Sequence, residues 1–166
     1  MDIDGRTYNE NEYKNYIHGS AEVIGLMCLR VFCENDNALY QELAPAACSL
    51  GSALQKINFL RDIKADYDER GRVYFPGVDF NNFTEKVKRE IEDDIKSDFK
   101  AGFKGIRHLP GGARLGVYIA YTYYIRLFKK ICNTPANVIL QKRIRISDAH
   151  KLILYFKAVL QHKLLY

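Results

Sequence analysis

The stretch Leu54–Asp66 constrains the fold most, because its polar and apolar residues separate onto opposite sides only in a helix. At about 100° per residue, one side of this helix carries four polar side chains within an arc of roughly 80°. They are Gln55, Asn58, Asp62 and Asp66. The other side carries Ala53, Ile57, Leu60 and Ile63. We predict that this apolar side is buried and that the stems of Lys56 and Lys64, which share it, snorkel to water.

The polar side has the composition of a divalent cation site. Asp62 and Asp66 stand one helical turn apart, and unit charges 4 Å apart repel by about 4 kcal/mol at an effective dielectric near 20. A cation would hold them together, and Asn58 adds a neutral oxygen. Such hard oxygen ligands suit Mg²⁺, which completes its shell with water and substrate phosphate. The alternative is an acidic, solvated helix face, which a D-x-x-x-D spacing alone would favour.

Composition excludes several classes of protein. The chain is 48% hydrophobic and 27% charged, which indicates a globular protein and not a disordered one. No apolar run is long enough to span a bilayer, and the acidic Met1–Arg6 segment does not resemble a signal peptide, so we expect a cytoplasmic protein. The spacing of the four cysteines indicates buried free thiols. The net charge of +5 suits nucleic acid, anionic lipid or an anionic substrate, or solubility alone.

Apolar periodicity along the chain predicts helices separated by turn residues, and therefore a single helical domain over residues 1–166. The expected helices are 11–31 with Asn9 or Asn11 as cap, one that starts at Ala44–Pro45 and carries Leu54–Asp66, one capped by Thr84, one over 113–132, and a last one capped by Ser147. In the third, the core positions are Val87, Ile91, Ile95, Phe99 and Phe103. We expect 113–132 to be buried on most sides and Glu90–Asp94 to be solvated.

Residues 67–82 are expected to form a loop at the mouth of the site, since they contain three glycine or proline residues. Arg70 and Arg72 there could pair with phosphate or with neighbouring carboxylates, and the sequence leaves both open. For Tyr16, the sequence alone explains a core tyrosine with a hydrogen-bonded hydroxyl as well as it explains a functional role.

The joint pattern of these motifs resembles one enzyme family. The spacing Gln55-x-x-Asn58-x-x-Arg61-Asp62-x-x-x-Asp66, followed by Arg72-Val-Tyr74-Phe-Pro76, resembles the second aspartate-rich region of the squalene and phytoene synthases. Upstream, residues 16–27 resemble the family's Y-C-Y-x-V-A-G-T-V-G-x-M helix. Tyr16, Ala21 and Gly25 match it, whereas His18, Ser20 and Glu22 depart from it. Residues 120–127 and 143–147 resemble the family's Y-I-x-I-L and R-V-R-L-S segments.

The resemblance implies an all-α helical bundle of the isoprenoid synthase type. It also implies a prenyltransferase that joins two farnesyl or geranylgeranyl diphosphates head to head, as in carotenoid or squalene-type isoprenoid biosynthesis. In that reaction the first substrate loses its diphosphate and its carbocation attacks the second substrate to give a cyclopropylcarbinyl diphosphate. A second ionisation with rearrangement completes the product. NADPH is implied only for a reductive, squalene-type reaction.

The same resemblance assigns roles to individual side chains. The implied Mg²⁺ ligands are Asn58, Asp62 and Asp66. The implied catalytic residues are Tyr16, Asp62 and Asp66. The implied substrate-binding residues are Ala21, Gly25, Gln55, Arg61, Tyr124 and Arg143. Tyr16 and Tyr124 would border the cationic chain with the negative faces of their rings.

The family's first aspartate-rich helix would precede Tyr8, and the sequence does not contain it. We therefore expect an incomplete bundle without the N-terminal helices, the C-terminal portion of a family domain, that is inactive alone. The alternative is a non-catalytic scaffold or assembly protein of the same fold. The intact Asn58, Asp62 and Asp66 favour the enzyme. A nucleic-acid binder is disfavoured because no compact basic recognition helix occurs. Peripheral membrane contact stays open, and the sequence predicts no oligomeric state.

Overall fold

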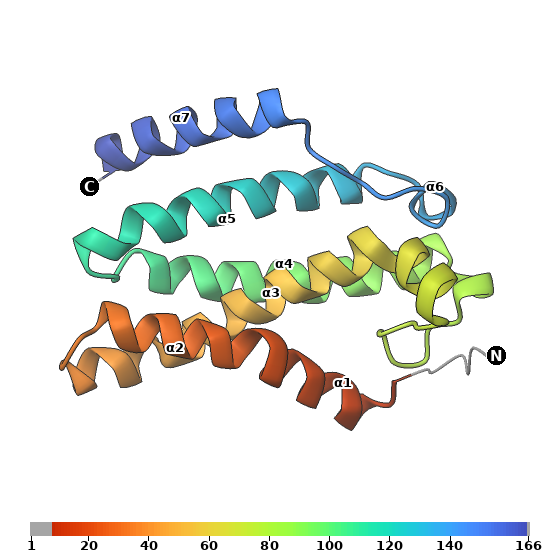
Figure 1. Ribbon diagram of the computed structural model, residues 1–166, viewed down its shortest axis with the longest axis horizontal. Helices are drawn as coiled ribbons and strands as arrows, with labels where there is room; N and C mark the ends of the chain where they lie inside the picture. The colour runs from red at the N-terminus through yellow and green to blue at the C-terminus, as the bar shows by residue number, and fades with distance from the viewer. Residues whose placement is uncertain (1–7, 166) are drawn as a thin grey trace.

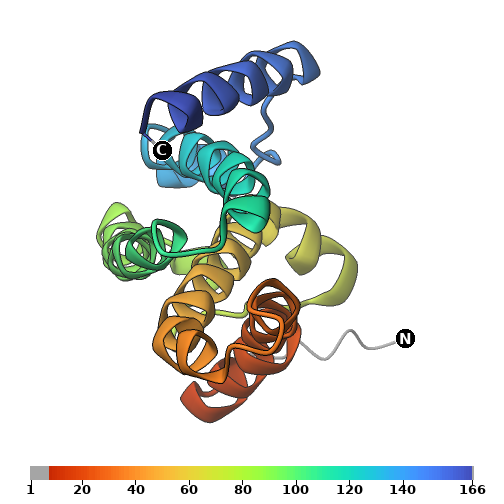
Figure 2. The same cartoon turned by 90° about the vertical axis from the view of Figure 1, so that its left-hand side faces the viewer.

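A long central helix, α3 (Asn37–Arg70), organises the computed structural model, which describes residues 8–165 (Figures 1 and 2). The other helical elements are α1 (Glu10–Ile17), the π-helical η1 (His18–Glu22), α2 (Val23–Phe32), the 3-10 turn η2 (Phe80–Asn82), α4 (Glu85–Ile106), α5 (Gly111–Cys132), α6 (Ala136–Ile139) and α7 (Asp148–Leu165). No strand occurs within residues 8–165, which confirms the all-α prediction. The Met1–Arg6 segment lies outside the described residues.

The expected first helix over 11–31 is present as one continuous helical segment with a change of winding inside it. Asn9 caps α1, since its side chain accepts hydrogen bonds from the N–H groups of Asn11 and Glu12 while Glu12 bonds back to the N–H of Asn9. The π-helical turn η1 then inserts between α1 and α2. Its five residues include the three positions that depart from the family motif, and the periodicity of the sequence did not indicate it.

The prediction that a new helix starts at Ala44–Pro45 is wrong. Helix α3 begins at Asn37, where the side chain of Asp36 accepts a hydrogen bond of 2.9 Å from the N–H of Leu39. Pro45 therefore lies inside the helix, at the cost of one backbone hydrogen bond. Capping by Asp36 starts the helix about two turns earlier than proline could. At the other end, the loop begins at Gly71, whose φ of 60° ends α3, and not at Tyr67.

The helices stack in layers around α3 (Figures 1 and 2). Helices α2 and α4 and the turn η1 pack on α3, α5 packs on α3 and α4, and α7 packs on α5. The predicted apolar side of α3 forms the centre of the core, with exposed fractions of 0% to 3%. These residues are Ala53, Ile57, Leu60 and Ile63.

Thr84 caps helix α4 as predicted, since its side chain accepts a hydrogen bond from the N–H of Val87. Ile95 and Phe99 are buried, whereas the other three expected core positions are half-buried. The expectation that the acidic run is solvated fails at Glu92, which is buried because it pairs with Lys88.

Helix α5 is less buried than expected. Tyr118, Leu127 and Phe128 lie on its buried face, but Ala120 and Arg126 are exposed, so burial on most sides is wrong. The reason is that its neighbours α3, α4 and α7 leave part of its surface uncovered.

The expectation that Lys56 extends to water is wrong. Its side chain is only 10% exposed, and its ammonium binds two carboxylates of α4, Asp94 at 2.5 Å and Asp98 at 2.8 Å. Burial alone would lower the pKa of Lys56, but these hydrogen bonds outweigh it and raise the pKa. Lys64 does reach the surface, where it pairs with Asp68.

The burial of the cysteines and the apolar character of the helices were also predicted from the sequence. All four cysteines are free, but only Cys33 is buried, and Cys28 is exposed, so the expectation of buried thiols is wrong in part. Within residues 8–165, no helix combines the length and apolar character needed to cross a bilayer.

Candidate active site

The predicted polar residues of α3 meet arginines from two parts of the chain. Asp62 accepts a hydrogen bond of 2.6 Å from its neighbour Arg61 and pairs at 2.5 Å with Nε of Arg143, which is 81 residues away. Arg143 belongs to the segment between α6 and α7. The hydrogen bond to Asp62 raises the pKa of Arg61, partial burial notwithstanding. In this cluster two guanidinium groups converge on one carboxylate. Forked donors of this kind also bind phosphate.

Asp66 lies one turn further along α3 and is more weakly paired. Its side chain is 17% exposed, and Arg70 donates a hydrogen bond of 3.2 Å to it. Burial raises the pKa of Asp66, the charge of Arg70 lowers it, and the charges of Asp62 and Glu69 raise it, with a net rise. Burial is the largest cause of this rise, so the charged form of Asp66 is poorly solvated, and a bound cation would stabilise it.

The donors on this face fit Mg²⁺ as a shared site. The amide oxygen of Asn58 and the carboxylates of Asp62 and Asp66 are hard oxygen ligands on one side of a rigid helix. Within residues 8–165, no cluster of three or more acidic, histidine or cysteine side chains is placed to hold a metal by itself. Water and a diphosphate would have to supply the remaining ligands, as is usual for Mg²⁺.

Tyr124 reaches this face from α5. Its hydroxyl donates to Oδ1 of Asn58 over 3.4 Å, which is long for an O–H···O bond. The contact nevertheless places the Tyr124 ring beside the polar side of α3.

Tyr16 sits in an aromatic cluster and not alone in the core. Its ring lies 5.2 Å from that of Tyr74, 5.6 Å from Phe59 and 5.8 Å from Tyr8. Burial raises the pKa of Tyr16, and Tyr74 and the charge of Asp66 add to this rise. The cluster therefore lies close to the carboxylate end of the polar face. Its four rings come from three parts of the chain, since Tyr8 and Tyr16 are close in sequence whereas Phe59 and Tyr74 are not. Helical spacing therefore gave no sign of the cluster, although Tyr74 belongs to the R-x-Y-x-P motif.

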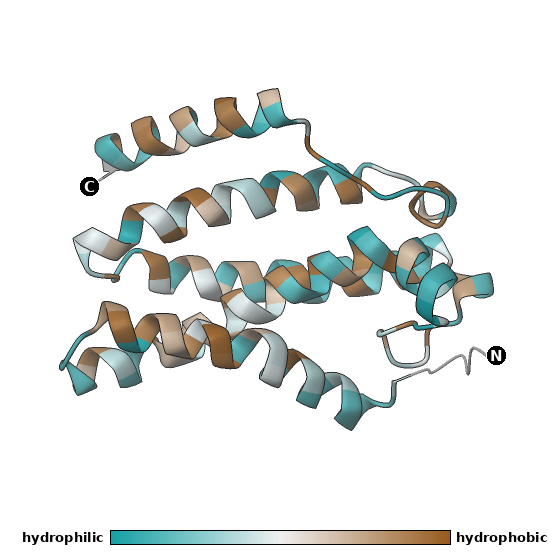
Figure 3. Ribbon diagram, in the orientation of Figure 1, coloured by the Kyte–Doolittle hydropathy of each residue, from teal (hydrophilic) through white to brown (hydrophobic). Residues whose placement is uncertain are grey.

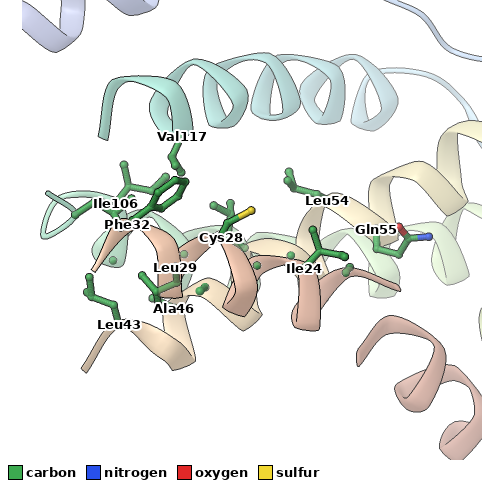
Figure 4. A pocket seen from close by; sticks show the side chains of 18 of the residues that line it. Ile24, Cys28, Leu29, Phe32, Leu43, Ala46, Leu54, Gln55, Ile106 and Val117 are labelled. Atoms are coloured by element: carbon green, nitrogen blue, oxygen red, sulfur yellow. The ribbon is translucent and has the colours of Figure 1, made fainter. Parts of the chain in front are cut away.

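An apolar cavity of about 280 Å³ opens beside the polar face, between α2, α3, α4 and α5. Figure 4 shows the amide of Gln55 at one end of it and Phe32, Leu43 and Ile106 at the other. Ala21 and Gly25, which the family resemblance implies as substrate-binding residues, are among its lining residues. Sequence reasoning missed most of the other lining residues, which include Ile24, Cys28, Leu50, Leu54 and Val117.

Small residues shape this cavity by letting the helices approach. A Cβ on Gly51 would lie 2.7 Å from the carbonyl oxygen of Ala21, and one on Gly25 would lie 2.9 Å from that of Ala47. Gly102 and Gly105 of α4 make similarly close approaches to α3. The repeated small residues in the sequence were the signal for this close contact, but their partners depend on the tertiary packing.

The structure thus gathers the predicted residues into two adjoining groups. One is charged and holds Asn58, Arg61, Asp62, Tyr124 and Arg143, with Asp66 and Tyr16 at its end. The other is the apolar cavity with Ala21, Gly25 and Gln55. Of the two arginines left open, Arg70 pairs with a carboxylate, and the interaction with Tyr74 raises the pKa of Arg72.

The sequence is similar to those of several known proteins. The sequence model described as squalene/phytoene synthase matches residues 1–150. The chain is 30% identical over 171 residues to a chloroplastic phytoene synthase of an Oncidium hybrid cultivar, covering 92% of this chain and 41% of the relative. It is 33% identical over 84 residues to a 4,4'-diapophytoene synthase of Staphylococcus haemolyticus, covering 51% and 28%.

A third relative is a squalene synthase of Bos taurus, 32% identical over 87 residues, which covers 51% of this chain and 21% of the relative. In all three comparisons the aligned part of the chain spans less than half of the relative's length.

Proposed function

The chain belongs to the squalene/phytoene synthase family, and we propose that it binds a prenyl diphosphate as part of a head-to-head prenyltransferase. One observation carries the proposal: Gln55 lies on the polar side of α3 and also at the end of the apolar cavity. A ligand with an anionic head and a hydrocarbon tail can therefore occupy both regions at once. We assign the charged group to the diphosphate and the cavity to the prenyl chain.

The side chains divide this work by their chemistry. Asn58, Asp62 and Asp66 would hold Mg²⁺, which when bound neutralises the charge of the diphosphate as it departs. Arg61 and Arg143 donate to the diphosphate oxygens, and in doing so they exchange Asp62 for phosphate as their partner.

The remaining residues act on the hydrocarbon. Tyr16 and Tyr124 lie with the charged group and not in the cavity, so the negative faces of their rings would meet the cationic carbon that forms next to the diphosphate. Ala21 and Gly25 leave room for it and exclude water from the cavity. Gln55 binds where head and tail meet.

We further propose that the substrates are two farnesyl or geranylgeranyl diphosphates, that the activity is cytoplasmic, and that NADPH takes part only if the product is reduced. No group of three or more acidic, histidine or cysteine side chains within residues 8–165 is placed to hold a metal, so water and substrate would have to supply most of the Mg²⁺ ligands. The chain alone should therefore bind substrate with little or no turnover. Steady conversion of prenyl diphosphate by the purified 166-residue chain would overturn this part.

Calorimetric titration of the purified chain with farnesyl diphosphate, with and without Mg²⁺, tests the binding. We expect binding that depends on Mg²⁺ and is lost in the double variant Asp62→Ala, Asp66→Ala. Asp68→Ala is the matched control, because Asp68 lies on the same helix but pairs with Lys64 at the surface. Binding that survives the double variant, or is lost equally in the control, would contradict the assignment.

The non-catalytic scaffold remains a second candidate, and one observation favours it. Asp62 pairs with two arginines and Asp66 with a third, so each carboxylate has a cationic partner within the protein. A scaffold could use the same contacts to join α3 to the segment before α7. In that case inorganic pyrophosphate with Mg²⁺ should not bind, while Arg143→Ala should lower stability.

A further inference from the structure

Helix α7 touches the rest of the molecule along one side only. Leu154 and Ala158 are buried, with exposed fractions of 9% and 0%, on the side that packs on α5. Gln161 also faces α5, since its side-chain oxygen accepts a hydrogen bond of 3.4 Å from the hydroxyl of Tyr118. The opposite side carries five large apolar side chains that are 59% to 78% exposed. They are Leu152, Ile153, Phe156, Leu160 and Leu164. We call this set the α7 apolar face, and its apolar turns are visible in Figure 3.

The excess of positive charge lies in the part of the chain that contains this helix. Residues 133–166 contain six lysine and arginine residues and one acidic residue, Asp148, which gives +5. Residues 1–132 contain 19 basic and 19 acidic residues and are neutral. The formal net charge of +5 therefore lies in residues 133–166. Helix α7 itself carries three lysines and one aspartate, and Arg143 before it pairs with Asp62 of α3.

Two lysines stand directly beside the α7 apolar face. Lys157 follows Phe156, and Lys163 lies three residues after Leu160, so both are neighbours of the face on the helix surface. Both are exposed, and within residues 8–165 neither has an acidic partner, whereas Lys151 pairs with Asp148. Exposed leucine and phenylalanine flanked by lysines are the side chains with which a protein surface binds an anionic lipid interface.

We propose that α7 docks the protein on an anionic lipid membrane, with the α7 apolar face in the headgroup layer and Lys157 and Lys163 on lipid phosphates. The helix lies on the bilayer, since no helix of residues 8–165 is able to cross it. A second copy of the chain is a poorer occupant. A two-fold contact between two such faces would bring the lysines of one copy next to those of the other. The proposal does not depend on the proposed prenyltransferase activity.

Fluorescence of an introduced tryptophan tests the orientation, because the chain contains none. Phe156→Trp should shift its emission to the blue when vesicles of phosphatidylcholine with about 30% phosphatidylglycerol are added. Val31→Trp is the matched control, since Val31 is a 72% exposed apolar residue of α2, at the other end of the helix stack (Figures 1 and 2). No shift is expected there.

Vesicle sedimentation measures the strength of binding. Phe156→Asp with Leu160→Asp should weaken partitioning to these vesicles by at least about tenfold. Met27→Asp with Val31→Asp, the same change on α2, should leave it unaltered.

The lysines are tested in the same assay. Lys157→Glu with Lys163→Glu should weaken binding more than Lys100→Glu with Lys104→Glu on α4, which changes the net charge equally. Salt of about 0.5 M should reduce the difference between these two charge variants.

Three results would overturn the proposal. The first is equal loss of binding in the α2 and α7 variants, and the second is no binding to anionic vesicles by the unmodified chain. The third is a blue shift of Phe156→Trp without vesicles that grows with protein concentration together with a dimeric mass. That result would assign the α7 apolar face to a contact between copies of the chain.

Discussion

The ion pairs of Lys56 make the sharpest test of how α3 is held. Its side chain is 10% exposed, and its ammonium bridges Asp94 and Asp98 of α4, whose side chains are 56% and 21% exposed. Ser52 also donates to Asp98 at 3.0 Å. In Lys56→Met the stem still fills its space, but both carboxylates lose their cation.

The expected loss follows from these exposures. Removing one member of a buried pair costs about 3–5 kcal/mol. Asp94 can regain water almost fully and Asp98 only in part, so we expect a loss of about 2 kcal/mol in the free energy of unfolding. For a domain of this size, this corresponds to a fall in Tm of about 4–8 °C. Urea unfolding followed by circular dichroism would measure it.

The pH dependence gives a second, independent readout. The folded pKa of Lys56 is raised above the ordinary 10.5, so its contribution is fully present below 10.5 and is lost as pH rises through the folded value. The difference between Lys56→Met and the unmodified chain should therefore stay constant near neutral pH and shrink above 10.5.

Lys64→Met is the matched control for this experiment. It makes the same change on the same helix, but Lys64 and Asp68 are 40% and 51% exposed, so the expected loss is below about 0.5 kcal/mol. If the two variants lost equal stability, the reasoning from burial would be refuted. The same holds if Lys56→Met were as stable as the unmodified chain.

Three further predictions follow from single sites. Gly51→Ala should lower Tm, with a loss of about 1–3 kcal/mol, because its Cβ would meet backbone at 2.7 Å, while Gly19→Ala, with nothing within 4 Å, should not; an equal effect of both in thermal unfolding would contradict this. Burial raises the pKa of Asp66 above 3.8, so its charge destabilises the fold at neutral pH. Asp66→Asn should thus be more stable there, with the gain vanishing below 3.8, and a gain independent of pH would exclude this cause. Burial raises the pKa of Cys132 to about 11, so mass spectrometry should find it alkylated by iodoacetamide more slowly than the exposed Cys28, and equal rates would argue against burial.

Local patterns in the sequence determined the helices and the orientation of α3. The separation of Asn58, Asp62 and Asp66 from the apolar residues is a property of helical geometry alone, so it could be predicted without any tertiary contact. The caps Asn9 and Thr84 are equally local, since each bonds the backbone within three residues. The start of α3 was predicted wrongly because proline is common in the first turn of a helix. Here Asp36 caps the helix upstream, and Pro45 lies inside it.

Only the tertiary structure decided which charges meet. Arg143 reaches Asp62 from 81 residues away, and Lys56 binds Asp94 and Asp98 on a helix whose position along α3 no local pattern specifies. The cavity has the same origin, because its volume depends on how closely glycines let the helices approach. The exposure of the α7 apolar face is also a tertiary result. Periodicity shows that a helix has an apolar face, but which side meets its neighbour depends on the packing of the whole stack.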